Sequence, residues 1–389
     1  MAQDSNPPKK ASIFLLGSQI ATGGSQNNLL RQGTWFTRQG YSVTAAFLYD
    51  KEHLLPSWSS THPFPIHDLG FASPKANIFV QTISFLKGLM ELFRLIRGGH
   101  YTAIETFTHH ANLIGLPLAW MAGIPTRVGS HRGKIEDLPP ALEGLHAIMI
   151  NSRIATRLVV VAERVREDAL AEGVHPQRII KIANGVELPK VGAAELLRVR
   201  SELGVSENDF LMLSVGRLRY QKGQDILLRA LPRVLTKFPH ALLLIAGEGV
   251  LRDELEAEAG RLNVTERVKF LGVRNDIPVL MSLADLFLFP SRFEGMPNAL
   301  MEAMGYGLPV IATGVQGVDE MIRDNENGLL VPLDDPEKVS DAILRLLNHP
   351  EERRRLGKAA QETIDKEYTL DKMCSQYEKL LTDKADGIS

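Results

Sequence analysis

The sequence predicts an α/β protein with two tandem doubly wound Rossmann-like domains that face a central cleft. A chain of 389 residues is too long for one comfortable hydrophobic core and suggests two domains. Apolar runs of strand length alternate with longer amphipathic stretches along the whole chain. Most runs are apolar at every position, which is typical of parallel strands covered by helices on both faces of a sheet.

The predicted strands follow one another in βαβ order. In the first half they are residues 12–17, 42–49, 101–107, 126–130, 146–151, 157–162 and 178–183. In the second half they are residues 210–216, 241–247, 267–272, 286–291, 308–313 and 328–332. Residues 224–238 carry a single apolar stripe and predict a helix packed on its sheet. Residues 78–97 predict a second helix, and its broad apolar face leaves two interpretations, a crossover helix or a helix on a membrane surface.

The boundary between the domains is predicted in the Gly- and Pro-containing stretch 184–192. This gives an N-terminal Rossmann-like domain over residues 1–186 and a C-terminal one over residues 187–368. Residues 369–389 are predicted to form a terminal helix with its apolar residues on one side. Ligands of such folds bind at the carboxyl ends of the strands, so the cleft between the domains is the expected site.

Composition narrows the class of protein further. Apolar residues make up 44% of the chain and charged residues 23%, as in an ordinary globular protein. The single cysteine, Cys374, excludes a disulfide framework and fits a reducing cytoplasm. We expect no secretory signal, no membrane span and no nucleic acid partner. Residues 1–186 carry 18 basic and 13 acidic side chains, which suits either an anionic surface or chance scatter.

Three loops after predicted strands carry candidate site residues. The first, after residue 17, contains Gly23 and Gly24 before a helix, which favours a phosphate cradle or a plain βα turn equally. Its glycine spacing is wrong for the dinucleotide motif G-x-G-x-x-G. The second contains Arg217 and Lys222, two cations that could clamp a pyrophosphate or could be solvated.

The third loop belongs to the stretch "SRFEGMPNALMEAMG", residues 291–305. Glu294 lies in the loop, and Glu302, after seven intervening residues, lies about one turn into a helix expected from Asn298. A carboxylate accepts hydrogen bonds from neighbouring sugar hydroxyls, and amides at a helix N-terminus suit phosphate. Taken alone, Glu302 could also be an ordinary charged side chain on the exposed face of a helix.

Together these motifs resemble the family 4 glycosyltransferases, which have the GT-B fold. The matching pieces are Gly23-Gly24, "THH" (108–110), "SHRG" (130–133), "NGVE" (184–187), "VGRLRYQKG" (215–223), "AGEG" (246–249), "FLGVRNDI" (270–277) and the E-x7-E element. The resemblance therefore spans nearly the whole chain, and its motifs in the second half are the more specific ones.

The resemblance implies that the N-terminal domain binds an acceptor and the C-terminal domain binds a nucleotide-diphosphate sugar, with a UDP- or GDP-sugar expected. The terminal helix is expected to cross back to the N-terminal domain. Catalytic residues carried over are His131, Glu294, Arg217 and Lys222. Donor-binding residues carried over are Gly23, Gly24, Arg217, Lys222, Val273, Arg274, Glu294, Gly295, Met296, Pro297, Asn298 and Glu302. His109, His110 and Arg132 are expected near the acceptor or in a packed core.

The resemblance also implies transfer with retention at the anomeric carbon, with no metal ion and no cofactor besides the nucleotide sugar. The acceptor is expected to be a sugar, a lipid-linked sugar or a small alcohol, in cell-surface polysaccharide or glycolipid synthesis. The expected location is the cytoplasm or the inner face of the membrane. Alternatives are a nucleotide-sugar epimerase and a non-catalytic nucleotide-sugar-binding protein; a nicotinamide dehydrogenase is disfavoured by the glycine spacing.

Overall fold

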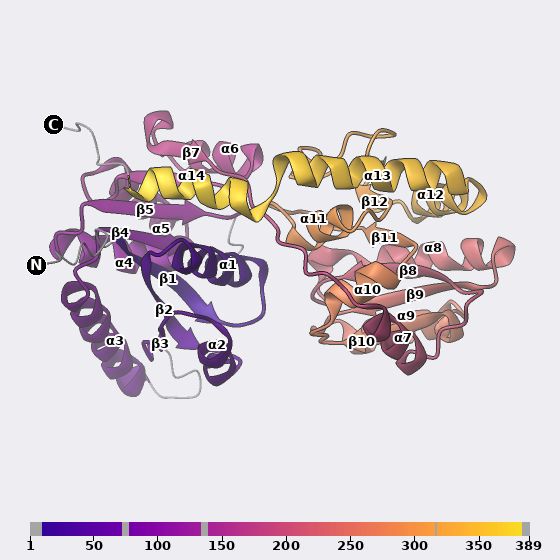
Figure 1. Ribbon diagram of the computed structural model, residues 1–389, viewed down its shortest axis with the longest axis horizontal. Helices are drawn as coiled ribbons and strands as arrows, with labels where there is room; N and C mark the ends of the chain where they lie inside the picture. The colour runs from indigo at the N-terminus through magenta and orange to yellow at the C-terminus, as the bar shows by residue number, and fades with distance from the viewer. Residues whose placement is uncertain (1–9, 72–77, 134–138, 316, 383–389) are drawn as a thin grey trace, which may run out of the picture. The chain divides into compact units, whose positions relative to one another are not determined.

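The computed structural model describes residues 10–71, 78–133, 139–315 and 317–382. The chain divides into two compact units (Figure 1). Unit 1 comprises Met1–Gly185 together with Leu370–Ser389, and unit 2 comprises Val186–Thr369. The terminal segment after residue 369 therefore belongs to unit 1, although it follows unit 2 in the sequence.

Unit 1 is built on a parallel sheet. Within the described residues its strand order is β3-β2-β1-β4-β5-β6-β7, and every neighbouring pair is parallel. The strands are β1 (Ser12–Ile20), β2 (Ser42–Asp50), β3 (Ile66–Asp68), β4 (Ala103–Phe107), β5 (Thr126–His131), β6 (Arg157–Val160) and β7 (Ile179–Lys181). Their side chains are buried along most of β1 and all of β4, as expected for strands covered on both faces.

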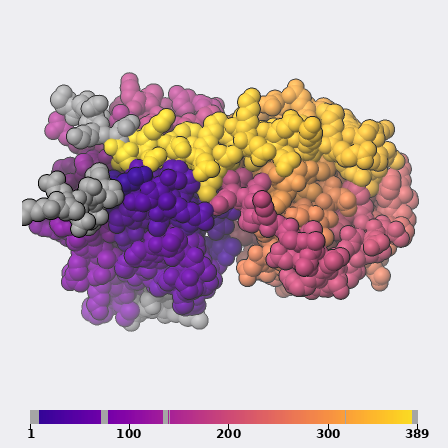
Figure 2. Space-filling view, in the orientation of Figure 1, coloured from indigo at the N-terminus to yellow at the C-terminus, as the bar shows by residue number. Residues whose placement is uncertain are grey.

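Helices cover both faces of this sheet. They are α1 (Gly24–Arg38), α2 (Leu55–Thr61), α3 (Ile78–Gly98), α4 (His109–Met121), α5 (Pro140–Asn151), α6 (Glu163–Ala171) and α14 (Leu370–Thr382). One core cluster joins α14 to α1 and to the sheet, through Met373, Cys374 and Tyr377. The terminal helix is thus an integral part of the unit 1 core, which Figure 2 shows as a yellow segment beside the indigo start of the chain.

Unit 2 repeats the same architecture with six strands in its described residues. Their order is β10-β9-β8-β11-β12-β13, again parallel throughout. The strands are β8 (Phe210–Val215), β9 (Ala241–Ala246), β10 (Val268–Gly272), β11 (Leu286–Phe289), β12 (Val310–Thr313) and β13 (Leu329–Val331). The helices are α7 (Ala193–Glu202), α8 (Gln224–Lys237), α9 (Arg252–Arg261), α10 (Ile277–Leu283), α11 (Asn298–Gly305), α12 (Pro336–Asn348) and α13 (Pro350–Glu367).

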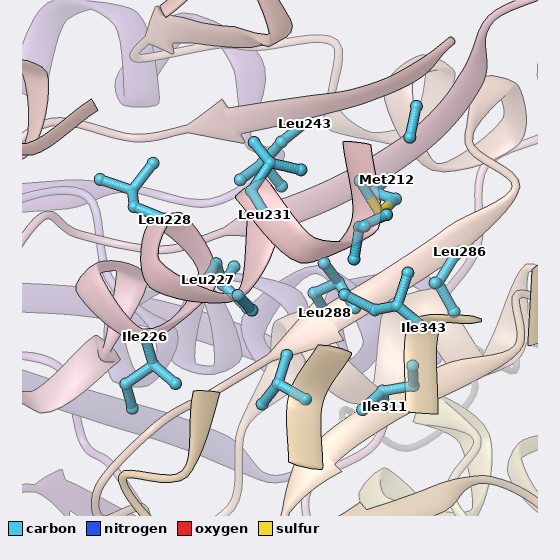
Figure 3. Close-up of a cluster of buried hydrophobic side chains, with 14 of the residues drawn as sticks. Met212, Ile226, Leu227, Leu228, Leu231, Leu243, Leu286, Leu288, Ile311 and Ile343 are labelled. Atoms are coloured by element: carbon cyan, nitrogen blue, oxygen red, sulfur yellow. The ribbon is translucent and has the colours of Figure 1, made fainter. Parts of the chain in front are cut away.

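The apolar stripe predicted over residues 224–238 forms one face of α8. Ile226, Leu227 and Leu231 are buried against Leu243 of β9 and Leu288 of β11, as Figure 3 shows. Aliphatic side chains at this spacing lie on one side of a helix, so their burial fixes how α8 packs on the sheet. A second cluster, on the other face of the sheet, includes Leu300 and Met304 of α11 and thereby positions that helix.

One predicted strand is wrong. Residues 146–151 form the end of α5. In this stretch Ala147 and Ile150 are buried while Ile148 is 69% exposed, so burial recurs every three to four residues instead of along the whole run. The short strand β3 was not predicted, because three residues at a sheet edge carry too little apolar pattern.

Helix α3 divides into two parts. Toward its C-terminal end Leu92 and Ile96 are buried, as expected for a crossover helix. Toward its N-terminal end several large apolar side chains are exposed; they are Phe79, Val80, Ile83, Phe85, Leu86 and Met90. The buried part agrees with the crossover interpretation, and the membrane-surface interpretation stays a prediction. Among the described residues, no helix is both long enough and apolar enough to span a bilayer.

Candidate active site

Each sheet has a point at which the strand order reverses. In unit 2 this point lies between β8 and β11, which are neighbours, and in unit 1 it lies between β1 and β4. In open parallel sheets the loops at the carboxyl ends diverge there and leave room for a ligand. The loops with the predicted residues follow these strands: residues 216–223 after β8 and residues 290–297 after β11.

The structure brings Lys222 and Glu294 together at the unit 2 reversal point. Lys222 Nζ lies 2.5 Å from Glu294 Oε1, and it also lies 5.5 Å from the centre of the Phe289 ring. The side chains are 18% and 8% exposed, respectively. A charge-assisted hydrogen bond at this depth is stronger than at the open surface, because less water competes for either group. The two predicted residues, 72 positions apart in sequence, therefore form one ion pair.

Glycines let these loops approach one another closely. Gly223 has φ of 65°, and a Cβ atom there would lie 2.1 Å from the carbonyl oxygen of Pro290. Gly247 has φ of 142°, and a Cβ atom there would lie 2.0 Å from the carbonyl oxygen of Gly216. Both positions combine a backbone conformation that other residues avoid with a contact that leaves no space for a side chain. The loops after β8, β9 and β11 therefore interlock through their backbones.

Arg292 joins the same two loops, and the sequence motifs did not identify it. Its guanidinium group donates to the carbonyl oxygen of Tyr220 (2.7 Å), to both carboxylate oxygens of Asp225 (3.0 and 2.8 Å) and to Asp334 (2.8 Å). It also stacks on the Tyr220 ring at 4.1 Å, and its backbone N–H donates to Gln221. The side chain is 7% exposed. Arg292 thus fixes the loop that carries Lys222 against the loop that carries Glu294.

Several predicted donor-binding residues lie near this pair in the fold. Arg217 is exposed in the loop directly after β8. Gly295, Met296 and Pro297 lead into α11, and Glu302 is half-buried on that helix. All of them therefore lie on the segments that follow β8 and β11.

Val273 and Arg274 follow β10, which is two strands away from β8. The side chain of Val273 is exposed. Arg274 is held by two carboxylates, with Nη2 at 2.6 Å from Asp276 and Nη1 at 2.6 Å from Glu202. The hydrogen bonds that Arg274 donates, first to Asp276 and then to Glu202, raise its pKa. Arg274 is therefore already engaged, and Val273 is the more accessible of the two residues.

The Gly23-Gly24 turn in unit 1 opens α1 as predicted, but without a left-handed backbone. Gly23 is the N-cap and is extended, with φ of −177° and ψ of 160°. Any residue adopts this conformation. A Cβ atom at Gly23 would meet only the end of the Gln26 side chain, at 2.6 Å. The glycine is thus compatible with close approach by a ligand, although backbone conformation alone does not require it.

His131 and His109 meet in a buried polar cluster in unit 1, together with His146 and Glu172. His131 ends β5, His109 begins α4, His146 lies on α5, and Glu172 caps the C-terminus of α6. His131 Nε2 lies 3.0 Å from Glu172 Oε1, and His109 Nε2 lies 3.4 Å from Glu172 Oε2. The side chains of His131 and His146 are fully buried. Sequence motifs gave no signal for His146 or Glu172, which come from two further helices.

Burial sets the ionisation of this cluster. Burial lowers the pKa of His131 and of His146, although hydrogen bonds to Glu172 act in the opposite direction. Burial alone would raise the pKa of Glu172, but hydrogen bonds from His109, His131 and His146 outweigh it and hold the pKa well below its usual range. At neutral pH the cluster is therefore a carboxylate among imidazoles, of which His131 and His146 are uncharged.

The residue before His109 adopts an unusual backbone conformation. Thr108 has φ of 85° and ψ of 157°, a region that non-glycine residues rarely occupy, and its buried hydroxyl has no hydrogen-bond partner among the described residues. Such a conformation costs on the order of 1–3 kcal/mol and persists where the surrounding structure enforces it. His110, one residue beyond His109, is exposed.

Arg132 makes several contacts within unit 1. Its guanidinium group lies 3.6 Å from Glu105, donates to Asn184 Oδ1 at 3.1 Å, and lies 4.4 Å from the Phe107 ring centre. It also donates to the hydroxyl of Tyr377, at 3.4 Å, and is 9% exposed. The side chain therefore joins the end of β5 to Asn184 and to α14, and the predicted acceptor contact stays a prediction.

Comparisons with known proteins agree with this architecture. Residues 198–363 match the model of the family described as glycosyl transferases group 1. The chain is 29% identical over 279 residues to the UDP-Gal:α-D-GlcNAc-diphosphoundecaprenol α-1,3-galactosyltransferase of Escherichia coli, which covers 69% of this chain and 72% of that protein. It is 26% identical over 368 residues to the D-inositol 3-phosphate glycosyltransferase of Segniliparus rotundus, covering 88% and 81%.

The solved structures give the same fold. The crystal structure of Anabaena HepE in complex with UDP and glucose has a TM-score of 0.84 at 21% identity, covering 96% of this chain and all of that one. Residues 198–363 therefore carry the sequence pattern of the group 1 glycosyltransferases, and the chain is built from the two Rossmann-like units of the GT-B fold. The predicted family and the predicted class of activity, sugar transfer from a nucleotide sugar, are confirmed at this level.

Proposed function

We propose that this enzyme transfers a sugar from a UDP- or GDP-sugar to a hydroxyl acceptor, with retention of configuration and without a metal ion. Unit 2 holds the donor and unit 1 receives the acceptor. The observation that carries this proposal is the Lys222–Glu294 pair at the reversal point of the unit 2 sheet. It supplies a cation for the diphosphate and a carboxylate for sugar hydroxyls in one place.

The ion pair also suggests how donor binding proceeds. The charge of Lys222 is balanced by Glu294 at 2.5 Å. A diphosphate would provide Lys222 with a second anionic partner, and Arg217 in the same loop would share the charge. Glu294 would then be free to accept hydrogen bonds from the transferred sugar. Several charge-assisted hydrogen bonds of roughly 1.5–3 kcal/mol each would stabilise the leaving group.

Glu302 is assigned to the ribose of the donor. It lies on α11, four residues after the N-terminus of that helix, where backbone N–H groups of residues 295–298 can meet phosphate oxygens. His131 is assigned a place beside the transferred sugar, as the family resemblance implies. Its side chain is buried among His109, His146 and Glu172, which leaves Nδ1 as the one nitrogen not facing Glu172.

A binding screen followed by a transfer assay tests the proposal. Thermal stability is measured with UDP-, GDP- and ADP-sugars, with and without EDTA, for the wild type and for Glu302→Ala. We expect stabilisation by sugars of one base that is indifferent to EDTA and about tenfold weaker in affinity in the variant, the value of roughly one lost hydrogen bond. The anomeric configuration of the product is then read by NMR. An inverted product, or transfer that EDTA abolishes, would contradict the proposal.

The same binding and transfer assays distinguish two alternative functions. A nucleotide-sugar epimerase would release a free product from the donor without any acceptor, whereas a glycosyltransferase requires the acceptor for full turnover. A non-catalytic binding protein would be stabilised by a donor but would neither transfer nor hydrolyse its sugar. The close pairing of Lys222 with Glu294 favours the transferase, because both charges are partly withdrawn from water at the strand ends.

We propose in addition that α3 contacts an anionic membrane surface, where a lipid-linked acceptor would be found. The exposed apolar side chains of its N-terminal half, such as Phe79, Leu86 and Met90, are accompanied by Lys87, Arg94 and Arg97. An apolar face with basic neighbours suits the boundary between lipid tails and anionic headgroups. The only acidic residue of the helix is Glu91, which lies 3.0 Å from Arg94.

Sedimentation with vesicles tests this contact. We expect binding to anionic vesicles at low salt, weaker binding at high salt, and at least a tenfold loss in a Phe79→Ser, Leu86→Ser double variant. Leu197→Ser is the matched control, because Leu197 is equally exposed but lies on α7 of unit 2. Equal binding of the control and the double variant, or no binding at low salt, would refute the contact.

A further inference from the structure

The contacts within the Glu172 cluster define which imidazole nitrogens carry hydrogen. Glu172 is 8% exposed and faces three imidazoles: His131 through Oε1 at 3.0 Å, and His109 and His146 through Oε2 at 3.4 and 3.6 Å. An ionised carboxylate accepts hydrogen bonds and donates none. Each nitrogen that hydrogen-bonds to Glu172 must therefore carry a hydrogen.

Asn112 fixes the tautomer of His146 independently. The backbone N–H of Ser130 donates to Asn112 Oδ1 (3.3 Å), and Asn112 Nδ2 donates to the carbonyl oxygen of Ser130 (3.2 Å). These backbone groups have fixed roles, so the orientation of the amide is settled. Asn112 Nδ2 also lies 2.9 Å from His146 Nε2, which must accept. The hydrogen of the neutral His146 is therefore on Nδ1, facing Glu172.

The same reasoning defines His131. Its Nε2 carries the hydrogen that is donated to Glu172, and its Nδ1 lies 3.4 Å from the backbone N–H of Gly133, which can only donate. His131 is thus held as the Nε2–H form, with the lone pair of Nδ1 turned toward the backbone N–H of Gly133. The contact with Gly133 is long, so a better donor could replace it.

We propose that Glu172 is a positioning residue for His131: it holds that imidazole in the Nε2–H form and so presents Nδ1 as a hydrogen-bond acceptor for a hydroxyl group of the substrate. The proposal rests on the proposed function, in which His131 lies beside the transferred sugar. In this arrangement His131 Nδ1 accepts a hydrogen bond from a hydroxyl group of the substrate. The same arrangement excludes a role in which His131 Nδ1 donates a proton to the substrate.

A metal site is the competing interpretation of the same cluster. Ligand atoms of His109, His146 and Glu172 lie within 4.8 Å of one another, and the contact between His146 Nδ1 and Glu172 Oε2 is long, at 3.6 Å. Coordination through Nδ1 would move the hydrogen of His146 to Nε2, against the amide hydrogens of Asn112 at 2.9 Å. The Asn112 contacts therefore favour the arrangement with hydrogen on Nδ1, and zinc addition becomes an arm of the test.

The charged and titratable groups around His131 predict how its titration responds. They are His109 on α4, His146 on α5, and Asp168 and Glu172 at the end of α6. Burial lowers the pKa of His131, and the hydrogen bond and charge of Glu172 oppose that effect. Replacing Glu172 by Gln removes the opposing charge. The pKa of His131 is then expected to fall further below its usual value.

The experiment uses the full chain labelled with ¹⁵N-histidine, with the His131 signals assigned from a His131→Asn spectrum. In the wild type at neutral pH, we expect a hydrogen on Nε2 and a bare Nδ1. In Glu172→Gln we expect a mixture of tautomers, because the amide can accept from or donate to His131. We expect kcat/KM for the donor to fall about tenfold in that variant. Glu167→Gln, an exposed glutamate on the same helix, is the control and should change neither.

The NMR spectra test the role of Glu172 independently of the transfer activity. A hydrogen on Nδ1 of His131 in the wild type would overturn it without any variant. It would also be overturned by an unchanged His131 in Glu172→Gln, or by stoichiometric Zn²⁺ binding that is lost in His146→Gln. A changed tautomer with unchanged transfer would leave Glu172 as the positioning residue and would instead refute the proposed place of His131 in the reaction.

Discussion

The unit 2 site places two opposite charges side by side, whereas the unit 1 cluster surrounds a single carboxylate with imidazoles. Lys222 and Glu294 balance each other at 2.5 Å and retain some exposure. Glu172 has no cation at a comparable distance among its described contacts, and N–H groups of buried histidines stabilise it instead. The first arrangement can exchange partners when a charged ligand arrives, while the second depends on where its hydrogens lie.

The two regions also differ in what holds them in shape. In unit 2 the loops touch backbone to backbone, at Gly223 and Gly247, and are fastened by Arg292. In unit 1 the residues come from β5 and from three helices, and side-chain hydrogen bonds and contacts between imidazole rings join them. Substitutions that remove a charge should therefore reduce catalysis most when they are made in unit 2. Substitutions that change where hydrogens lie should act mainly on the cluster in unit 1.

The largest effect is expected from Glu294→Gln. The substitution keeps the size of the side chain and removes the charge that would lie beside the sugar, so we expect kcat to fall about 10³-fold with a smaller change in KM for the donor. Steady-state kinetics with the preferred donor checks this. Glu326→Gln, an exposed glutamate of the same unit, is the control. A variant with more than a tenth of wild-type kcat would refute the role of Glu294.

A backbone change in unit 2 is expected to cost about 3 kcal/mol of unfolding free energy. In Gly247→Ala the new Cβ atom would lie 2.0 Å from the carbonyl oxygen of Gly216, at a φ of 142°. Gly260→Ala is the matched control, because Gly260 lies in α9 with open space around it and alanine favours a helix. Denaturant unfolding should show a lower unfolding free energy than the wild type for Gly247→Ala and a higher one for Gly260→Ala. Equal stability of both would mean that the loops do not depend on this contact.

These comparisons indicate what the sequence could predict. Apolar runs identified nearly all strands, and the motifs placed Lys222 and Glu294 in loops that do meet, because parallel strands end at one edge. Residues 146–151 were misassigned, since a run of apolar letters does not distinguish a half-exposed helix from a strand. Glu172 and Arg292 were missed because each acts through partners distant in sequence, His131 and Asp225 respectively, and no local pattern records such pairs.

The buried carboxyl of Glu105 in unit 1 is expected to make stability depend on pH. Burial raises its pKa to about 8, although Arg132 lies 3.6 Å away and acts in the opposite direction. The folded protein therefore holds a proton that the unfolded chain releases near pH 4.5. Unfolding free energy should fall as pH rises through that interval, by an amount of the order of 3 kcal/mol between pH 5 and pH 8.

Glu105→Gln isolates this dependence, because glutamine has a similar size and stays neutral. Relative to the wild type, the variant should gain stability as pH rises from 5 to 8, while Glu167→Gln should follow the wild type throughout. Urea unfolding at several pH values measures both. Parallel curves for Glu105→Gln and the wild type would mean that Glu105 is ionised in the folded protein and paired with Arg132. Unit 1 would then also contain an ion pair of buried charges, and it would differ less from unit 2.

The smallest of these effects, about 2 kcal/mol in stability, is expected from Arg292→Lys in unit 2. Lysine keeps the charge, but its single ammonium group does not reach the Tyr220 carbonyl, Asp225 and Asp334 together, and it loses the planar stacking on the Tyr220 ring. Because the two loops would then move relative to each other, Lys222 and Glu294 would hold a donor less well, and KM should rise about tenfold. Arg323→Lys, an exposed arginine paired with Glu326, is the control. A loss of stability with unchanged KM would show that the interlocked glycines alone keep the loops in place, and that the unit 2 site depends on its backbone more than on Arg292.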